Sequence, residues 1–178
     1  MERPNIVKQS VADLYWLAAL LTGSRGIAAD VALQVIALQD ESTGFAAWIH
    51  SWSRRIVIAK ALAAVRKELA DSAARIASRR VSTAASSQIW MVDGETTKPE
   101  LERALLSIDA FPRAAVLLLI FERVPLLDAA TLLDSEPELL RRALAAGIQD
   151  LTKNLAMMQD WKAAGTRSNT AASEESHV

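Results

Sequence analysis

Two tryptophans and a run of basic residues give one stretch of this chain the composition of a nucleic-acid contact. Trp48 and Trp52 are one helical turn apart, and Arg54, Arg55 and Lys60 follow them directly. Aromatic rings stack on unpaired bases and basic side chains neutralise phosphates, so such a face suits a single nucleic-acid strand. The alternative is that both tryptophans are core residues and the basic residues form a solvated face.

Composition predicts that helices carry these residues. The chain has 178 residues, 51% of them hydrophobic, with only 6 Gly and 5 Pro, which favours an all-α protein of one or two small domains. The formal net charge is −1, so the global basic signature of an autonomous nucleic-acid binder is absent. Nucleic-acid binding within a larger complex, where another subunit supplies the charge, stays open.

Apolar residues at helical spacing predict three helices in the N-terminal half, over residues 6–21, 27–39 and 45–69, with an extension of the third to residue 79 left open. The sequence Thr22-Gly23-Ser24 stops the first helix. Small polar residues predict a linker over 76–98, with an apolar island at 89–92 that could dock on a domain.

A second set of apolar groups lies between residues 101 and 155 and has the layout of a helix-turn-helix core. A break at Phe111-Pro112 and two short gaps separate the groups. Ser135, Pro137 and the neighbouring glutamates are typical of a helix start. The polar segment 161–178 is predicted to be a disordered tail.

Several kinds of chemistry are not supported by the residues of this chain. With no cysteine there is no disulfide or thiolate metal site, and the two histidines, His50 and His177, are far apart. There is no phosphate-binding glycine loop, no nucleophile elbow, and no apolar run of the ~20 residues that span a bilayer. We therefore expect no enzyme, no metal, no cofactor and no membrane partner. With no secretory signal pattern, the expected location is the cytoplasm.

Residues 128–144 resemble the promoter-recognition helix-turn-helix of RNA polymerase sigma factors of the extracytoplasmic-function type. The ungapped match covers an acidic position, a small residue, three apolar positions and a basic position; these are Asp128, Ala130, Leu133, Leu140, Arg141 and Leu144. Upstream, residues 111–116 are similar to that family's approach helix, with its arginine at Arg113. The resemblance implies DNA contacts by Arg113, Arg141 and Arg142, although exposed helical arginines are often only a solvated face.

Polar positions of the family are mostly replaced here. The turn glycine is Asp134, the serine that approaches phosphate is Glu136, and the threonine is Leu139. Together with Glu138, these acids bring negative charge to a surface that would meet phosphates, which predicts weakened duplex binding. The alternative is that the acids only stabilise the start of the helix.

The N-terminal half also resembles the family. Residues 14–25 are similar to the opening of the sigma domain that binds polymerase, and the spacing of Phe45, Trp48 and Trp52 is similar to the approach to its strand-melting helix. In that helix the family's asparagine, aspartate and arginine are Arg55, Ala59 and Leu62. The resemblance implies polymerase contacts by the second helix, for which the candidates are Asp30, Leu33 and Gln34.

The resemblance implies a polymerase-binding domain over 1–75, a linker over 76–98, a helix-turn-helix domain over 99–160 and the tail over 161–178. Its implied partners are core RNA polymerase, promoter DNA and an anti-sigma factor. One alternative is a helical protein-interaction module, as a homodimer for example, on a degenerate sigma scaffold. Another is an unrelated helical bundle that matches by chance.

Overall fold

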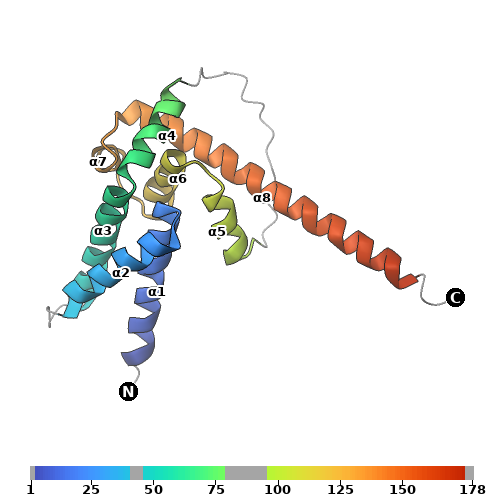
Figure 1. Cartoon of the computed structure of the whole chain (residues 1–178), viewed down its shortest axis with the longest axis horizontal. Coiled ribbons are helices and arrows are strands. Elements are labelled where there is room, and N and C mark those ends of the chain that lie inside the picture. Colours follow the sequence, from blue (N-terminus) through green and yellow to red (C-terminus); the bar gives the residue numbers. More distant parts are fainter. Residues whose placement is uncertain (1–2, 41–45, 79–95, 175–178) are drawn as a thin grey trace.

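A computed structural model describes the backbone of residues 3–40, 46–78 and 96–174, and the side chains of 11–37, 52–78 and 96–159. Every regular element in these ranges is a helix, which confirms the all-α prediction (Figure 1). In chain order they are α1 (Arg3–Thr22), α2 (Arg25–Asp40), α3 (Ala46–Ala64), α4 (Arg66–Ser78), α5 (Lys98–Leu106), α6 (Ala110–Val116), the π-helix η1 (Leu117–Phe121), α7 (Leu126–Leu132) and α8 (Pro137–Glu174). None of these helices combines the length and apolar character that crossing a membrane requires.

The first two helices meet at the predicted stop. Thr22 Oγ1 donates to the Ala18 carbonyl at 2.8 Å and accepts from the Ser24 amide at 3.2 Å. Between them Gly23 has φ +68°, a left-handed conformation that ends a helix without the steric cost a Cβ would bring. Helix α2 then begins at Arg25, two residues earlier than predicted.

The third predicted helix is divided in the structure. Helix α3 ends at Ala64 and α4 begins at Arg66, with Val65 at the join. The 3.6-residue pattern continues across the join because Val65 and Leu69 are both buried, so the sequence carries no sign of the break.

The C-terminal helices begin with local caps. Thr97 and Glu100 form a capping box at α5, where the Thr97 amide donates to Glu100 Oε2 at 2.9 Å. Asp109 caps α6 by accepting from the Ala110 amide at 3.0 Å. The chain therefore breaks before Asp109 and not at Phe111-Pro112, because a proline in the first turn of a helix lacks only an amide that the helix does not use.

Helix α8 begins at Pro137, close to the predicted start, and its backbone is helical to Glu174 (Figure 1). The predicted tail from residue 161 is therefore helical in the structure over most of its length. Helix propagation costs little once a long helix has formed, so polar residues that follow a long helix can extend it.

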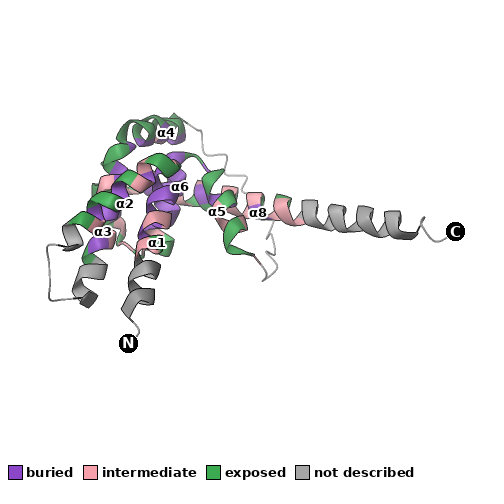
Figure 2. Ribbon diagram, turned by 60° about the horizontal axis from the view of Figure 1, so that its bottom comes forward, coloured by how far each residue is buried: buried purple, intermediate pink, exposed green. Residues whose placement is uncertain are grey.

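Buried residues from both halves of the chain belong to one hydrophobic cluster (Figure 2). Leu14 and Leu17 of α1 lie in it together with Phe111 of α6 and Leu140 of α8. Lys98 of α5 also lies over the ring of Trp16, 5.0 Å from its centroid. The division into two domains stays a prediction, since most of the linker, including the island at 89–92, lies outside the described residues.

Gly147 sets how closely α8 approaches α6. A Cβ at this position would lie 2.7 Å from the Pro112 carbonyl oxygen and 2.7 Å from Val116 Cγ2. Neither neighbour is the free end of a flexible side chain, so the two helices touch at a point that only glycine allows.

Candidate nucleic-acid and partner-binding surfaces

The outer face of α3 carries an exposed aromatic residue beside a basic one. Trp52 is 55% exposed, so the alternative that both tryptophans are core residues does not hold for it. Arg55, one turn further on, is also exposed, while Val57 and Ile58 on the other side of the helix are buried. The side chain of Trp48 lies outside the described residues.

Arg54 is held by a carboxylate from the other half of the chain. Its Nε donates to Glu122 Oε2 at 2.9 Å, and its Nη2 donates to Glu122 Oε1, so both prongs of the guanidinium are used. This hydrogen bonding raises the pKa of Arg54 above its ordinary value, and burial opposes the rise. Arg54 is therefore committed to joining α3 to the segment after η1.

Lys60 and Gln34, predicted to belong to two different surfaces, contact each other. Lys60 Nζ donates to Gln34 Oε1 at 2.9 Å, which links α3 to α2. Near this contact Leu33 is 64% exposed and Asp30 is exposed. Asp30, Leu33 and Gln34 thus form an outward face of α2, which we call the α2 face.

The turn between α7 and α8 has the geometry of a helix C-cap. The Ser135 amide donates to the Ala130 carbonyl at 3.0 Å and the Asp134 amide to the Thr131 carbonyl at 3.2 Å, the paired bonds of a Schellman motif. Asp134 has φ +50°, the left-handed conformation that favours glycine. The Ser135 hydroxyl donates to the Glu136 carbonyl at 3.3 Å, and among the described residues no amide of α8 donates to it, so the predicted side-chain cap is not found.

The arginines at the start of α8 are both engaged. Arg141 Nη1 pairs with Glu138 Oε2 at 3.0 Å on the exposed surface. Arg142 Nη2 donates to the Ile76 carbonyl in the last turn of α4 at 2.9 Å. Asp134 and Glu136 are exposed beside them. The negative charge expected at this surface is present, and Arg142 is directed toward the protein.

Arg113 lies in the interior, 4% exposed. Its Nη1 donates to the carbonyls of Ile108 at 3.0 Å and Leu106 at 3.4 Å, and burial lowers its pKa. A Cβ on Gly23 would lie 2.9 Å from Nη2. We therefore correct its assignment: Arg113 supports the end of α5 against the end of α1, where no DNA can reach it in this fold.

Other positions at which the sequence departs from the resemblance differ in their environment. Leu62 is 4% exposed and belongs to the core, Leu139 is half-buried against it, and Ala59 is exposed. Leu62 is thus accounted for by packing within this chain and does not need a partner to cover it.

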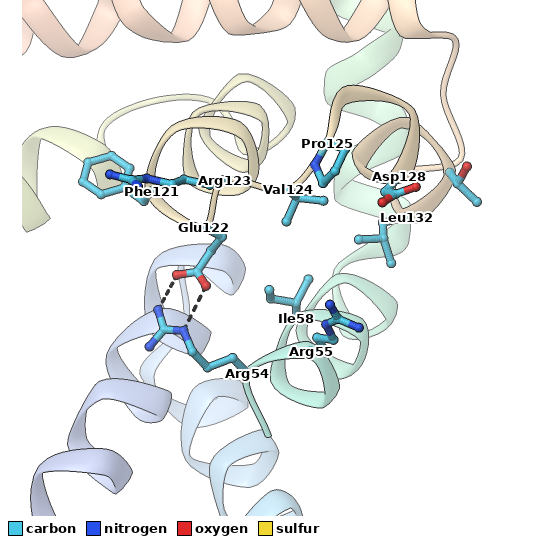
Figure 3. A pocket seen from close by; sticks show the side chains of 11 residues that line it. Arg54, Arg55, Ile58, Phe121, Glu122, Arg123, Val124, Pro125, Asp128 and Leu132 are labelled. Carbon is cyan, nitrogen blue, oxygen red and sulfur yellow. Dashed lines mark hydrogen bonds and ion pairs between the residues drawn. The ribbon is translucent and has the colours of Figure 1, made fainter. Parts of the chain in front are cut away.

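A groove that sequence reasoning missed lies between α3 and the corner from η1 to α7 (Figure 3). Arg54, Arg55 and Ile58 line it from α3, and residues 121–125 line the opposite wall. Arg123 has φ +53° where the chain turns into this corner. No spacing pattern could have found the groove, because its walls are more than 60 residues apart in the sequence.

No model of a protein family, no curated protein and no solved structure matches this chain.

Proposed function

We propose that this chain is a sigma-factor-like protein that acts in transcription initiation by binding core RNA polymerase, with weakened contacts to promoter DNA. The observation that carries the proposal is the turn between α7 and α8. Asp134 stands where the resemblance expects a glycine, and it adopts the left-handed conformation that favours glycine. A turn followed by a helix start at this position supports helix-turn-helix geometry.

The α2 face supports the polymerase contact. Leu33 is 64% exposed and is flanked by Asp30 and Gln34, so an apolar side chain with a polar surround is open to a partner. Interfaces commonly have an apolar centre and a polar rim. A protein with this role would act in the cytoplasm, together with the polymerase.

The exposed side chains of α3 supply the nucleic-acid contact in this proposal. Trp52 would stack on an unpaired base and Arg55 would neutralise a phosphate of the opened strand. At α8, Asp134, Glu136 and Glu138 oppose the approach of duplex phosphates, so duplex recognition by that helix would be weak.

The direct test measures binding of purified bacterial core RNA polymerase to the full-length chain by calorimetry or surface plasmon resonance. We expect a stable complex and at least tenfold weaker binding by Leu33→Glu, since the substitution would place a charge in the centre of the contact. Leu127→Glu is the matched control, because Leu127 is equally exposed, at 68%, but lies on α7. A folded wild-type chain that fails to bind polymerase would refute the proposal.

A second candidate is a helical protein-interaction module on a degenerate sigma scaffold. It is favoured by the internal use of predicted DNA contacts: Arg54 binds Glu122, Arg113 is buried, and Arg142 binds the Ile76 carbonyl. Light scattering separates the candidates, because a stable homodimer whose interface includes Leu33 would leave no α2 face for polymerase. An anti-sigma factor as partner stays a prediction of the resemblance.

A further inference from the structure

The groove between α3 and the η1–α7 corner has the size of a small-molecule site. Its volume is about 750 Å³, within the range of roughly 300–1,000 Å³ common for ligand pockets. In Figure 3 the side chains of Ile58, Val124 and Leu132 approach one another across its middle. These three come from α3, the corner and α7, so a molecule lying there would contact all three walls.

The middle of the groove is apolar, with some of its surface open. Ile58 is 4% exposed, Val124 is half-buried, and Leu132 is 38% exposed. Apolar side chains that converge in a concavity give an apolar ligand a favourable place to leave water.

Some of the charged residues that line the groove are paired within the protein, and others are not. Three arginines and two carboxylates line the groove. Glu122 is occupied by both prongs of Arg54, which closes one end. This leaves Arg55 and Arg123 against Asp128. All three are exposed, and none makes a side-chain ion pair or hydrogen bond with another residue in the described part of the chain.

The uneven pairing selects the charge of a ligand. A cation would find only the single carboxylate of Asp128 and would meet two free guanidinium groups. An anion would meet the free fork of Arg55, which matches the geometry of a carboxylate. Arg55 lines the groove from α3 and Leu132 lines it from α7, so a charged head and an apolar body can be accommodated in it together (Figure 3).

We propose that this groove binds a small organic anion, a carboxylate with an apolar body. The carboxylate pairs with the Arg55 guanidinium, and the body lies against Ile58, Val124 and Leu132. The Arg54–Glu122 pair holds α3 against the corner and so keeps the groove shaped in the absence of ligand. This assignment does not rest on a role in transcription.

The test is a calorimetric titration of the full-length chain with decanoate, with no nucleic acid or polymerase present, so that its result is independent of the proposed function. We expect one site, a loss of affinity of at least tenfold for Arg55→Glu and at least fivefold for Leu132→Asn. Arg66→Glu, the same change at an exposed arginine outside the groove, should alter affinity less than twofold. Circular dichroism confirms that each variant is folded.

Decyltrimethylammonium, which has the opposite charge and an alkyl chain one carbon longer, should bind at least tenfold more weakly than decanoate. The proposal would be overturned by absence of decanoate binding at millimolar concentration, by equal affinity of wild type and Arg55→Glu, or by equal binding of the cation. Equal affinity of all the variants would mean that decanoate associates with some other exposed apolar surface.

Discussion

Helix α3 and the start of α8 were both predicted to meet nucleic acid, and the structure presents them differently. On α3, Trp52 and Arg55 are exposed. On α8, Arg141 pairs with Glu138 and Arg142 donates to a carbonyl of α4. A basic residue in the right register therefore does not by itself predict a nucleic-acid contact, because its charge can be paired within the protein.

The difference follows from where the acids lie. The first turn of α8 holds Glu138, and acidic residues stabilise a helix start by interacting with its dipole. That same acid is within reach of Arg141. On α3 the described ion pair is that of Arg54 with Glu122, which leaves Arg55 open. If the proposed function holds, we therefore expect single-strand binding through α3 to be stronger than duplex binding through α8.

The largest effect expected is a loss of stability where α8 packs against α6. Gly147→Ala places a Cβ in contact with Pro112 and Val116, and overpacking of about 3 kcal/mol, reduced by about 1 kcal/mol of helix propensity, lowers the free energy of unfolding by about 2 kcal/mol. Chemical denaturation measures this change. Gly26→Ala is the control: it lies in a helix with only Ser24 Oγ within 4 Å, at 3.9 Å, and should be neutral or slightly stabilising.

The next effect concerns the ion pair between Arg54 and Glu122, which keeps the charge of Arg54 from acting on a ligand at the surface of α3. Glu122→Gln keeps the shape of the side chain and removes its charge, so the free energy of unfolding should fall by about 1.5 kcal/mol, as for a hydrogen bond to a charged group. The freed Arg54 should then tighten oligothymidylate binding about threefold through an added phosphate contact. Unchanged stability together with unchanged binding would show that this pair does not hold the two regions together.

One substitution in each region compares their contributions to single-strand binding directly. Trp52→Ala should weaken binding to an oligothymidylate about tenfold, through the loss of one base stack worth about 1.4 kcal/mol. Arg141→Ala should change the affinity less than twofold, because the adjacent carboxylate of Glu138 offsets the charge of Arg141. Fluorescence anisotropy at low salt measures both. Equal losses in the two variants would mean that α8 contributes as much as α3.

The smallest effect is a pH dependence at the contact of α4 with α6. Arg75 donates to both carboxylate oxygens of Asp109, at 2.9 and 2.7 Å, and this pairing lowers the pKa of Asp109. The ionised carboxylate therefore stabilises the fold above its ordinary pKa near 4, and this contribution is lost as the pH falls toward the lower folded value.

Thermal unfolding between pH 6 and pH 3 tests this point. Asp109→Asn keeps a good helix cap, so the variant should lose less of its melting temperature than wild type over that range. The same acid sensitivity in both proteins would exclude Asp109 as a source. The effect should be modest, because the pair is exposed to solvent.

Sequence patterns predicted the helices better than the environment of their polar residues. The stop at Thr22-Gly23 and the start near Pro137 follow from local chemistry and are found in the structure. The fate of Arg54, Arg113 and Arg142 depends on partners 68, 5 and 66 residues away, and a pattern along one helix cannot show such partners. Gly23 could have hinted at a close approach, but a glycine does not reveal that Arg113 is its neighbour.

The most direct test of the proposed function compares two templates in complex with core RNA polymerase. The full-length chain, polymerase and either a pre-opened bubble or the fully paired form of the same DNA are mixed, and retained complexes are measured by native gel electrophoresis. We expect a three-component complex on the bubble that Trp52→Ala weakens, and little or none on the duplex. Equal retention of both templates, or retention of the duplex alone, would contradict the proposed function.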